Sequence, residues 1–382
     1  MCVFDELIER RGDGSEKWNR YPPDVLPMWI ADMDFRSPPA IVEALVERAR
    51  FGVYGYQIYD DMPALLAGWL RAAYGCEAEA DWIVPVHALV PALAQAASVR
   101  GGRVLIPVPT YMGILSAPGK SGAAATLCPL KNVDERYRMD VADMRVRAGS
   151  GAETLMLCNP HNPVGRVFTR EELLEASAFA QENNLLVVSD EVHSELIFEG
   201  RHTPFWSVDE YARNNSITLM GPGKTCNVAG LPFGFAVIPN GAVRTAFKKA
   251  AYAISEPGVM HAAAARAAYG GACDGWKKEL VAYLKGNRDV LEAGLRDISP
   301  EIRFPRIEGS YLQWVDFGAL THGESAASWL LRTAKIAAND GAMFYGAAAA
   351  PVPGRSCARL NFAAPRSRIA CALQRIAGAV GL

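Results

Sequence analysis

Short, uniformly apolar runs alternate with helical patterns through the middle of the chain. Runs without the polar alternation of a half-exposed strand are typical of strands covered on both faces. Five such runs are Arg103–Val108, Thr154–Cys158, Leu185–Ser189, Ile217–Met220 and Phe233–Ile238. Glu171–Asn183 reads as an intervening helix, capped by Thr169 and with two glutamates in its first turn. The pattern predicts an α/β fold with a mostly parallel sheet.

The two ends of the chain lack the regular alternation of apolar strands and helices seen in the middle. The first forty residues are rich in Pro and Trp, which predicts an extended arm. Helical patterns cover Pro39–Phe51, Met62–Tyr74 and Trp276–Asp297. Beyond them, short strands are predicted at Tyr311–Asp316 and Ala358–Phe362. They alternate with helices predicted at Ser325–Asn339 and Arg366–Val380. We therefore expect a large domain at 45–280 and a small α+β domain made of 1–44, including the arm, and 281–382.

Composition narrows the class of protein. The 382 residues carry a net charge of −2, which argues against a nucleic-acid partner. No run of about 18 apolar residues is present, and the first eighteen residues are charged throughout, so we expect a cytoplasmic protein with no membrane partner. The eight cysteines form no Cys-x-x-Cys pair and the six histidines no His-Glu-x-x-His motif. This favours neither a metal site nor a disulfide framework.

Three polar clusters directly follow three of the predicted strands. They are Asn159–Gly165, Ser189–His193 and Gly221–Thr225. Ligands of open α/β sheets bind at the carboxyl ends of strands, so we expect an Asn, an Asp and a Lys to meet in one crevice.

Simpler interpretations exist for each cluster. Asparagines beside prolines are usually turn residues, a lone Asp after a strand is usually a helix cap, and a lone Lys is usually solvated. Gly223-Lys224-Thr225 resembles the end of a phosphate-binding loop, but the required earlier glycine is Thr218. A dinucleotide fingerprint would need glycine where Cys226 stands. The functional interpretation therefore depends on the order and spacing of the clusters.

The three residue types suit one cofactor, pyridoxal 5′-phosphate (PLP). A lysine can form an imine with its aldehyde and later act as an acid or base. An aspartate beside the pyridine nitrogen keeps that nitrogen protonated, which makes the ring an electron sink. An asparagine amide can donate to the phenolate oxygen of the ring.

The sequence resembles fold-type I PLP-dependent enzymes, and within them the cystathionine β-lyase-like C–S lyase branch of the class I/II aminotransferase family. The resemblance covers essentially the whole chain, and its most specific pieces are Pro27-Met-Trp-Ile-Ala-Asp-Met-Asp-Phe35 and Asp190-Glu-Val-His193. Further matching stretches are Phe4-Asp5, Lys17–Asn19, Tyr54–Tyr56, Val90–Leu93, Asn159–Gly165, Lys224–Leu231, Glu308–Leu312 and Arg359–Phe362. It implies a large, mostly parallel α/β/α domain and a smaller α+β domain.

The resemblance also implies a role for individual residues. Lys224 forms the Schiff base and is the catalytic base at the substrate Cα. The cofactor-binding set is Asp190 at the pyridine nitrogen, Asn162 at the phenolate oxygen, His193 nearby, Tyr111 stacked on the ring, and the helix start at Ala88 and Leu89 at the phosphate. Tyr56 reaches the phosphate of a neighbouring subunit, so a homodimer is implied. The substrate-binding set is Arg359, which holds the α-carboxylate, with Ala31 and Asp32 on the substrate side.

The sequence departs from the family pattern where the phosphate should bind. Relatives usually carry hydroxyl residues where Gly221 and Gly223 stand, and a glycine where Ala88 stands. Pro232 replaces an arginine common in aminotransferases. We expect either weaker retention of PLP or a rebuilt phosphate site that uses His87.

The reaction that the resemblance favours is α,β-elimination from a cysteine S-conjugate to thiol, pyruvate and ammonia, and the altered phosphate site favours a specialised substrate in natural-product biosynthesis. Two alternatives stay open within PLP chemistry, an oxygen-dependent oxidative decarboxylation and deamination, and transamination. A regulator or scaffold that kept the fold without catalysis is a further alternative.

Overall fold

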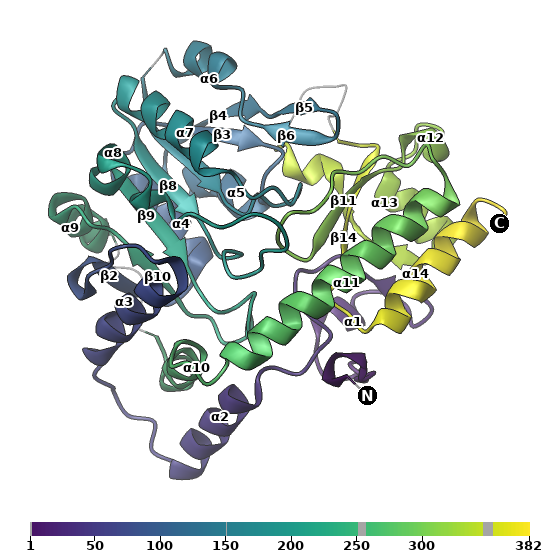
Figure 1. Ribbon diagram of the computed structural model, residues 1–382, viewed down its shortest axis with the longest axis horizontal. Coiled ribbons are helices and arrows are strands. Elements are labelled where there is room, and N and C mark those ends of the chain that lie inside the picture. Colours follow the sequence, from purple (N-terminus) through teal and green to yellow (C-terminus); the bar gives the residue numbers. More distant parts are fainter. Residues whose placement is uncertain (1, 150, 251–256, 347–353) are drawn as a thin grey trace.

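The computed structural model describes residues 2–149, 151–250, 257–346 and 354–382. A seven-stranded sheet forms the centre of the larger part of the molecule (Figure 1). In spatial order its strands are β2 (Ile83–Val86), β10 (Gly234–Val237), β9 (Ser216–Met220), β8 (Leu186–Asp190), β7 (Ala152–Cys158), β3 (Arg103–Val108) and β4 (Ala124–Pro129). All run in one direction except β10, which is antiparallel to both of its neighbours. The expected mostly parallel sheet is confirmed.

Helices cover both faces of this sheet because successive strand residues point to opposite sides. Ile106 and Met156 pack on one side, against α4 (Leu89–Ser98), α5 (Met112–Ser121) and α9 (Gly241–Ala250). Leu105 and Leu155 pack on the other, against α6 (Val141–Ala148), α7 (Arg170–Glu182) and α8 (Glu210–Asn214). Burial on both faces explains why the strands read as continuous apolar runs.

Local sequence signals set several boundaries of these elements. Thr169 and Glu172 form a reciprocal capping box at the start of α7, as the N-cap prediction anticipated. Helix α2 (Pro39–Phe51) ends at Gly52 and α3 (Asp61–Tyr74) at Gly75, both in the left-handed conformation. Helix α10 (Val259–Tyr269) packs against α2 and α3 and, with α3, completes a third apolar cluster of the large part.

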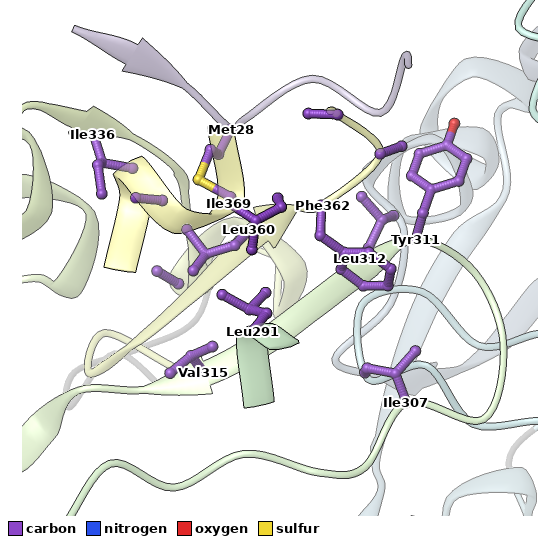
Figure 2. Close-up of a cluster of buried hydrophobic side chains, with 14 of the residues drawn as sticks. Met28, Leu291, Ile307, Tyr311, Leu312, Val315, Ile336, Leu360, Phe362 and Ile369 are labelled. Atoms are coloured by element: carbon purple, nitrogen blue, oxygen red, sulfur yellow. The ribbon is translucent and has the colours of Figure 1, made fainter. Parts of the chain in front are cut away.

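A second, smaller sheet contains β11 (Leu312–Asp316), β14 (Cys357–Asn361) and β13 (Asn339–Asp340), all antiparallel. The N-terminal segment joins this part, since β1 (Leu26–Pro27) pairs with β12 (Ile336–Ala337). Figure 2 shows the apolar core here, to which the arm contributes Met28, the small sheet Leu312 and Leu360, and the C-terminal helix Ile369. Other elements are α1 (Glu16–Asn19), the hairpin β5 (Lys131–Val133) and β6 (Arg136–Arg138), α12 (Gly318–Thr321) and α14 (Arg366–Ala379).

The long helix α11 (Asp274–Ile298) runs between the two parts (Figure 1). The predicted domain boundaries at 44/45 and 280/281 fall inside α2 and α11. The division into these two domains stays a prediction.

The helix predicted over Ser325–Asn339 is too long. The helical stretch consists of α13 (Ala326–Trp329) and a π-helical turn at Leu330–Ala334, and it ends where Lys335 adopts φ 54°. Ile336 and the residues after it then form β12 and β13, because pairing with the arm and with β14 outweighs helix propensity. No helix in the described ranges combines the length and the apolar character needed to cross a membrane.

Candidate active site

A cavity of about 230 Å³ lies at the carboxyl edge of the large sheet. The parallel strands bring their carboxyl ends together there, and β10, which runs the other way, begins there. Eight of the eleven predicted site residues line the cavity: Ala31, Ala88, Leu89, Tyr111, Asn162, Asp190, His193 and Lys224. The three polar clusters of the sequence therefore do meet in one crevice.

Lys224 reaches the cavity from the turns after β9. Its Nζ donates to the Ala31 carbonyl oxygen at 2.7 Å. Burial lowers the pKa of Lys224 to about 8, and the positive charge of Arg359 acts in the same direction. An amine with this pKa has a substantial neutral fraction near neutral pH, as a nucleophile for an aldehyde requires.

Asp190 ends β8 on the floor of the cavity. Burial raises the pKa of Asp190 to about 6, against the opposing effect of a hydrogen bond from the Val192 N–H. The charge of Lys224 also acts to lower the pKa, but no cation among the described residues forms an ion pair with the Asp190 carboxylate, which is therefore desolvated and only partly compensated. A pyridinium nitrogen would supply that cation, so this carboxylate fits the expected cofactor.

Arg359, on β14 of the small sheet, is not part of the cavity lining but contacts it at Asn162. Its guanidinium donates to the Asn162 Oδ1 at 3.1 Å, the Trp29 carbonyl at 2.9 Å and the Asn339 Oδ1 at 2.6 Å. Its Nε is buried and has no partner among the described residues. Burial lowers the pKa of Arg359 to about 10. A buried cation whose partners are all neutral is suited to a carboxylate ligand.

Two other predicted residues have clear local reasons for their positions. Tyr111 precedes α5, and its ring lies so close to Gly113 that a Cβ there would be 2.3 Å from Tyr111 Cε1. Gly113 therefore permits this ring position. His193 is buried, its Nδ1 has no partner among the described residues, and burial holds its pKa well below the usual value. His193 thus faces the cavity as a neutral imidazole.

Two predicted residues lie elsewhere in this chain. Asp32 does not line the cavity, and its carboxylate lies 3.1 Å from Arg10 Nη2 and 3.5 Å from Lys17 Nζ. Tyr56 is fully exposed, on the segment between α2 and α3. Its predicted contact with a neighbouring subunit stays a prediction.

Two residues that shape the site were assigned no role from the sequence alone. Asn227 and Asn361 lie in stretches that match the family, but nothing in the sequence indicated what they contact. Asn361 donates to the carbonyls of Ile30 and Asp32 at 2.6 Å, and Asn227 bonds to both backbone groups of Met33. Their backbone-directed amides hold the arm against the cavity, and only the fold reveals that.

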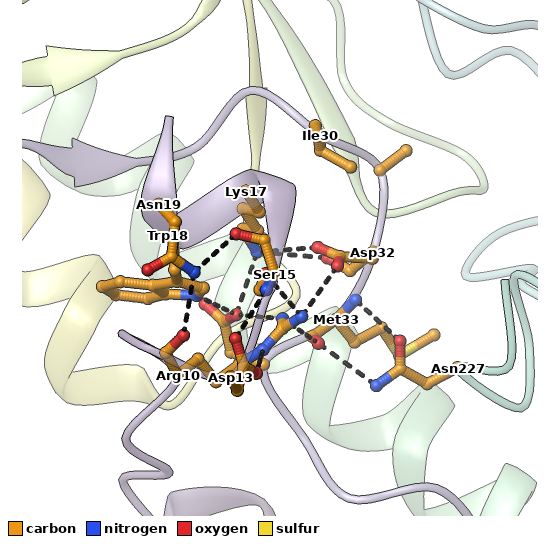
Figure 3. A network of polar contacts seen from close by, with 12 residues as sticks. Arg10, Asp13, Ser15, Lys17, Trp18, Asn19, Ile30, Asp32, Met33 and Asn227 are labelled. Atoms are coloured by element: carbon orange, nitrogen blue, oxygen red, sulfur yellow. Dashed lines mark hydrogen bonds and ion pairs between the residues drawn. The ribbon is translucent and has the colours of Figure 1, made fainter. Parts of the chain in front are cut away.

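A buried ionic network fixes the other side of this arm (Figure 3). Lys17 Nζ donates to the Asp32 carbonyl at 3.1 Å and lies 3.2 Å from Asp34 Oδ1, which also accepts from Trp18 Nε1 at 2.8 Å. Burial opposes ionisation of Asp34, but the charge of Lys17 and the Trp18 hydrogen bond outweigh it and lower its pKa. The network sets the path of the backbone whose Ala31 carbonyl contacts Lys224.

We expect Lys17→Met to lower the free energy of unfolding by about 3 kcal/mol, because it leaves buried carboxylates short of a cation. Arg36→Met is the matched control, since the Arg36–Glu6 pair is exposed and screened by solvent and should contribute little to stability. Urea denaturation measures both. Equal losses in the two variants would contradict the role of the network.

The chain has relatives of known name over its whole length. The family model for aminotransferase class I and II matches residues 23–376. Cystathionine beta-lyase PatB of Bacillus subtilis (strain 168) is 34% identical, with 99% of each chain covered. The PLP-containing cystalysin of Treponema denticola has a TM-score of 0.91 at 29% identity, covering 99% of this chain and 98% of its own. The PLP-bound C-S lyase of Staphylococcus hominis has a TM-score of 0.89 at 27% identity, with the same coverage. The chain therefore belongs to the aminotransferase class I and II family, as a PLP-dependent enzyme of its cystathionine β-lyase-like, carbon–sulfur lyase branch.

Proposed function

We propose that the protein cleaves a cysteine S-conjugate by α,β-elimination. The conjugate and one water give a thiol, pyruvate and ammonium, as the Cα–H and Cβ–S bonds break. The observation that carries this proposal is the buried amine of Lys224, with a pKa of about 8, in one cavity with the desolvated carboxylate of Asp190. The similarity to proteins named cystathionine beta-lyase and C-S lyase supports a sulfur leaving group.

The cofactor, when bound, supplies an electron sink next to the substrate Cα. Asp190 holds the proton on the pyridine nitrogen. Asn162 contacts the phenolate oxygen, and its orientation is set by the hydrogen bond from Arg359. Tyr111 packs on the ring and His193 contributes a neutral imidazole, while Ala88 and Leu89 present the start of α4 to the phosphate.

The amino-acid part of the substrate is bound by the arm and the small sheet. Arg359 holds the α-carboxylate and thereby orients the Cα–H bond. The free amine of Lys224 takes the proton from Cα, and its contact with the Ala31 carbonyl keeps Nζ close to that position. Asp32, the residue after Ala31, does not contact the substrate. Its ion pairs with Arg10 and Lys17 hold the backbone at Ala31 in place.

The exposed apolar surface around Tyr56 supports a proposal for the assembly. Phe51, Val53, Tyr54 and Ile58 are each more than half exposed in the single chain. A patch of this kind is typical of a protein interface. We assign it to a second copy of this chain in a cytoplasmic homodimer, in which Tyr56 reaches the phosphate of the partner. The role in natural-product biosynthesis stays a prediction.

Incubation with an S-alkyl cysteine should release thiol, pyruvate and ammonia in equal amounts without oxygen uptake. Lys224→Ala should lose at least about a hundredfold in rate, because no other amine replaces the base. Lys248→Ala, at an exposed lysine of α9, is the control and should keep the wild-type rate. Oxygen uptake with an oxidised product, or pyruvate without thiol, would contradict elimination.

Arg359→Lys should raise KM for the same substrate roughly tenfold to a hundredfold with a smaller change in kcat, because lysine cannot form the bidentate contact with a carboxylate. Arg355→Lys lies four residues earlier, at an exposed position, and should leave KM unchanged. Steady-state kinetics measures both. A loss confined to kcat would place Arg359 away from the carboxylate.

The rate at which the cofactor-free protein captures PLP should rise with pH and level off above about pH 8. Only the unprotonated amine attacks an aldehyde, and the pKa of Lys224 is about 8. An ordinary lysine would give a rate that still rises near pH 10. Stopped-flow absorbance over this pH range measures the profile, and a continued rise would contradict the lowered pKa.

A further inference from the structure

The phosphate end of the cavity has lost its polar side chains. The polar side chains that line the cavity are those of Tyr111, Asn162, Asp190, His193 and Lys224, which are assigned above to the ring and the imine, while the rest of the described lining is apolar or glycine. A side chain cannot be restored at Gly221, because a Cβ there would lie 2.7 Å from the Phe233 carbonyl and 3.4 Å from Leu89 Cδ1. The phosphate dianion therefore needs a partner other than the usual hydroxyl groups.

Two histidines lie beside the start of α4, just behind the cavity lining and not part of it. His87 immediately precedes Ala88, the N-cap of α4, and both Ala88 and Leu89 line the cavity. His261 lies in the first turn of α10, and its ring centroid is 5.4 Å from that of His87, with the planes inclined by 47°. The two imidazoles are 174 residues apart in sequence, one just before α4 and one in α10, and their rings meet beside the start of α4.

Both imidazoles have an unused nitrogen. The Nδ1 atoms of His87 and His261 are buried and have no hydrogen-bond partner within the described ranges. A buried polar nitrogen without a partner is unfavourable, so a ligand that supplies a hydrogen bond to it is favoured. Burial, and after it the nearby His87, lowers the pKa of His261. An anion beside the His261 ring would oppose that shift.

We propose that His87 and His261 bind the phosphate group of PLP, together with the backbone N–H groups at the start of α4. The pair replaces the hydroxyl and arginine side chains that are absent at Gly221, Gly223 and Pro232. Imidazole donors suit phosphate because hydrogen bonds between a donor and an ionised oxygen are short and strong. The assignment depends on the placement of the cofactor given above, and it is independent of the reaction that follows.

The test compares PLP with pyridoxal, which lacks the phosphate. The full chain is freed of cofactor and titrated with each compound, and tryptophan fluorescence gives the two dissociation constants. His87→Phe and His261→Phe keep a ring of similar size and remove the nitrogens. We expect each variant to weaken PLP roughly tenfold to a hundredfold and to leave pyridoxal within about twofold.

His322→Asn is the control, because it removes an exposed imidazole at a left-handed position that asparagine tolerates. It should change neither constant. The double variant His87→Phe/His261→Phe should weaken PLP by less than the product of the single effects, since the two rings share one group. Equal weakening of PLP and pyridoxal, or no weakening of either, would overturn the assignment.

A second measurement uses the unaltered protein, in case a variant fails to fold. Addition of inorganic phosphate to the cofactor-free chain should shift the imidazole NMR signals of His87 and His261 and leave that of His322 in place. Unshifted signals at saturating phosphate would also overturn the assignment. A protein that passes both tests but releases no thiol from cysteine conjugates would contradict the proposed reaction alone.

Discussion

The carbonyl oxygen of Ala31 joins two parts of the chain that are far apart in sequence. It accepts from Lys224 Nζ at 2.7 Å and from the Tyr311 hydroxyl at 3.0 Å. Lys224 lies in the turns after β9 of the large sheet, Tyr311 directly precedes β11 of the small sheet, and Ala31 lies on the arm. The position of the reactive amine therefore depends on how the arm packs between the two sheets. This explains why the side chains of Asn227, Asn361 and Lys17 all bond to the backbone of the short segment 30–33.

The same region contains charges that the chain does not balance by itself. Lys224, Arg359 and Asp190 are all desolvated, and none forms a hydrogen-bonded ion pair with another. Such an arrangement costs folding free energy and persists where ligands supply the missing charges. A pyridinium at Asp190 and a carboxylate at Arg359 would do so. On the arm the situation differs, because Lys17 and Asp34, which are buried away from the cavity lining, are paired with each other.

The two ends of the cavity differ in how closely their side chains match the family, at the expected position of the cofactor ring and at that of its phosphate. Around the ring, the side chains are those that the family resemblance implies. Around the phosphate, Gly221 has no room for a side chain, and Leu89 packs against it. A change from polar to apolar lining at an anion site requires compensation, and the two imidazoles beside the start of α4 are well placed to provide it. The loss of hydroxyl residues at positions 221 and 223 and the unpartnered Nδ1 atoms of His87 and His261 thus have one common explanation.

The sequence by itself determined the strands and the chemistry at their ends. Uniformly apolar runs such as Arg103–Val108 predicted the buried strands, and the parallel arrangement then brought Asn162, Asp190 and Lys224 to one edge. Local signals also sufficed for α7, where the capping box is a short-range interaction. The tertiary structure alone decided the end of the helix before Lys335, since strand pairing with the arm outweighs helical propensity there. It also decided the pairing of the half-buried Asp32 with Arg10, the backbone contacts of Asn227 and Asn361, and the approach of His261 to His87. These depend on contacts between residues that are distant in sequence, which no local pattern records.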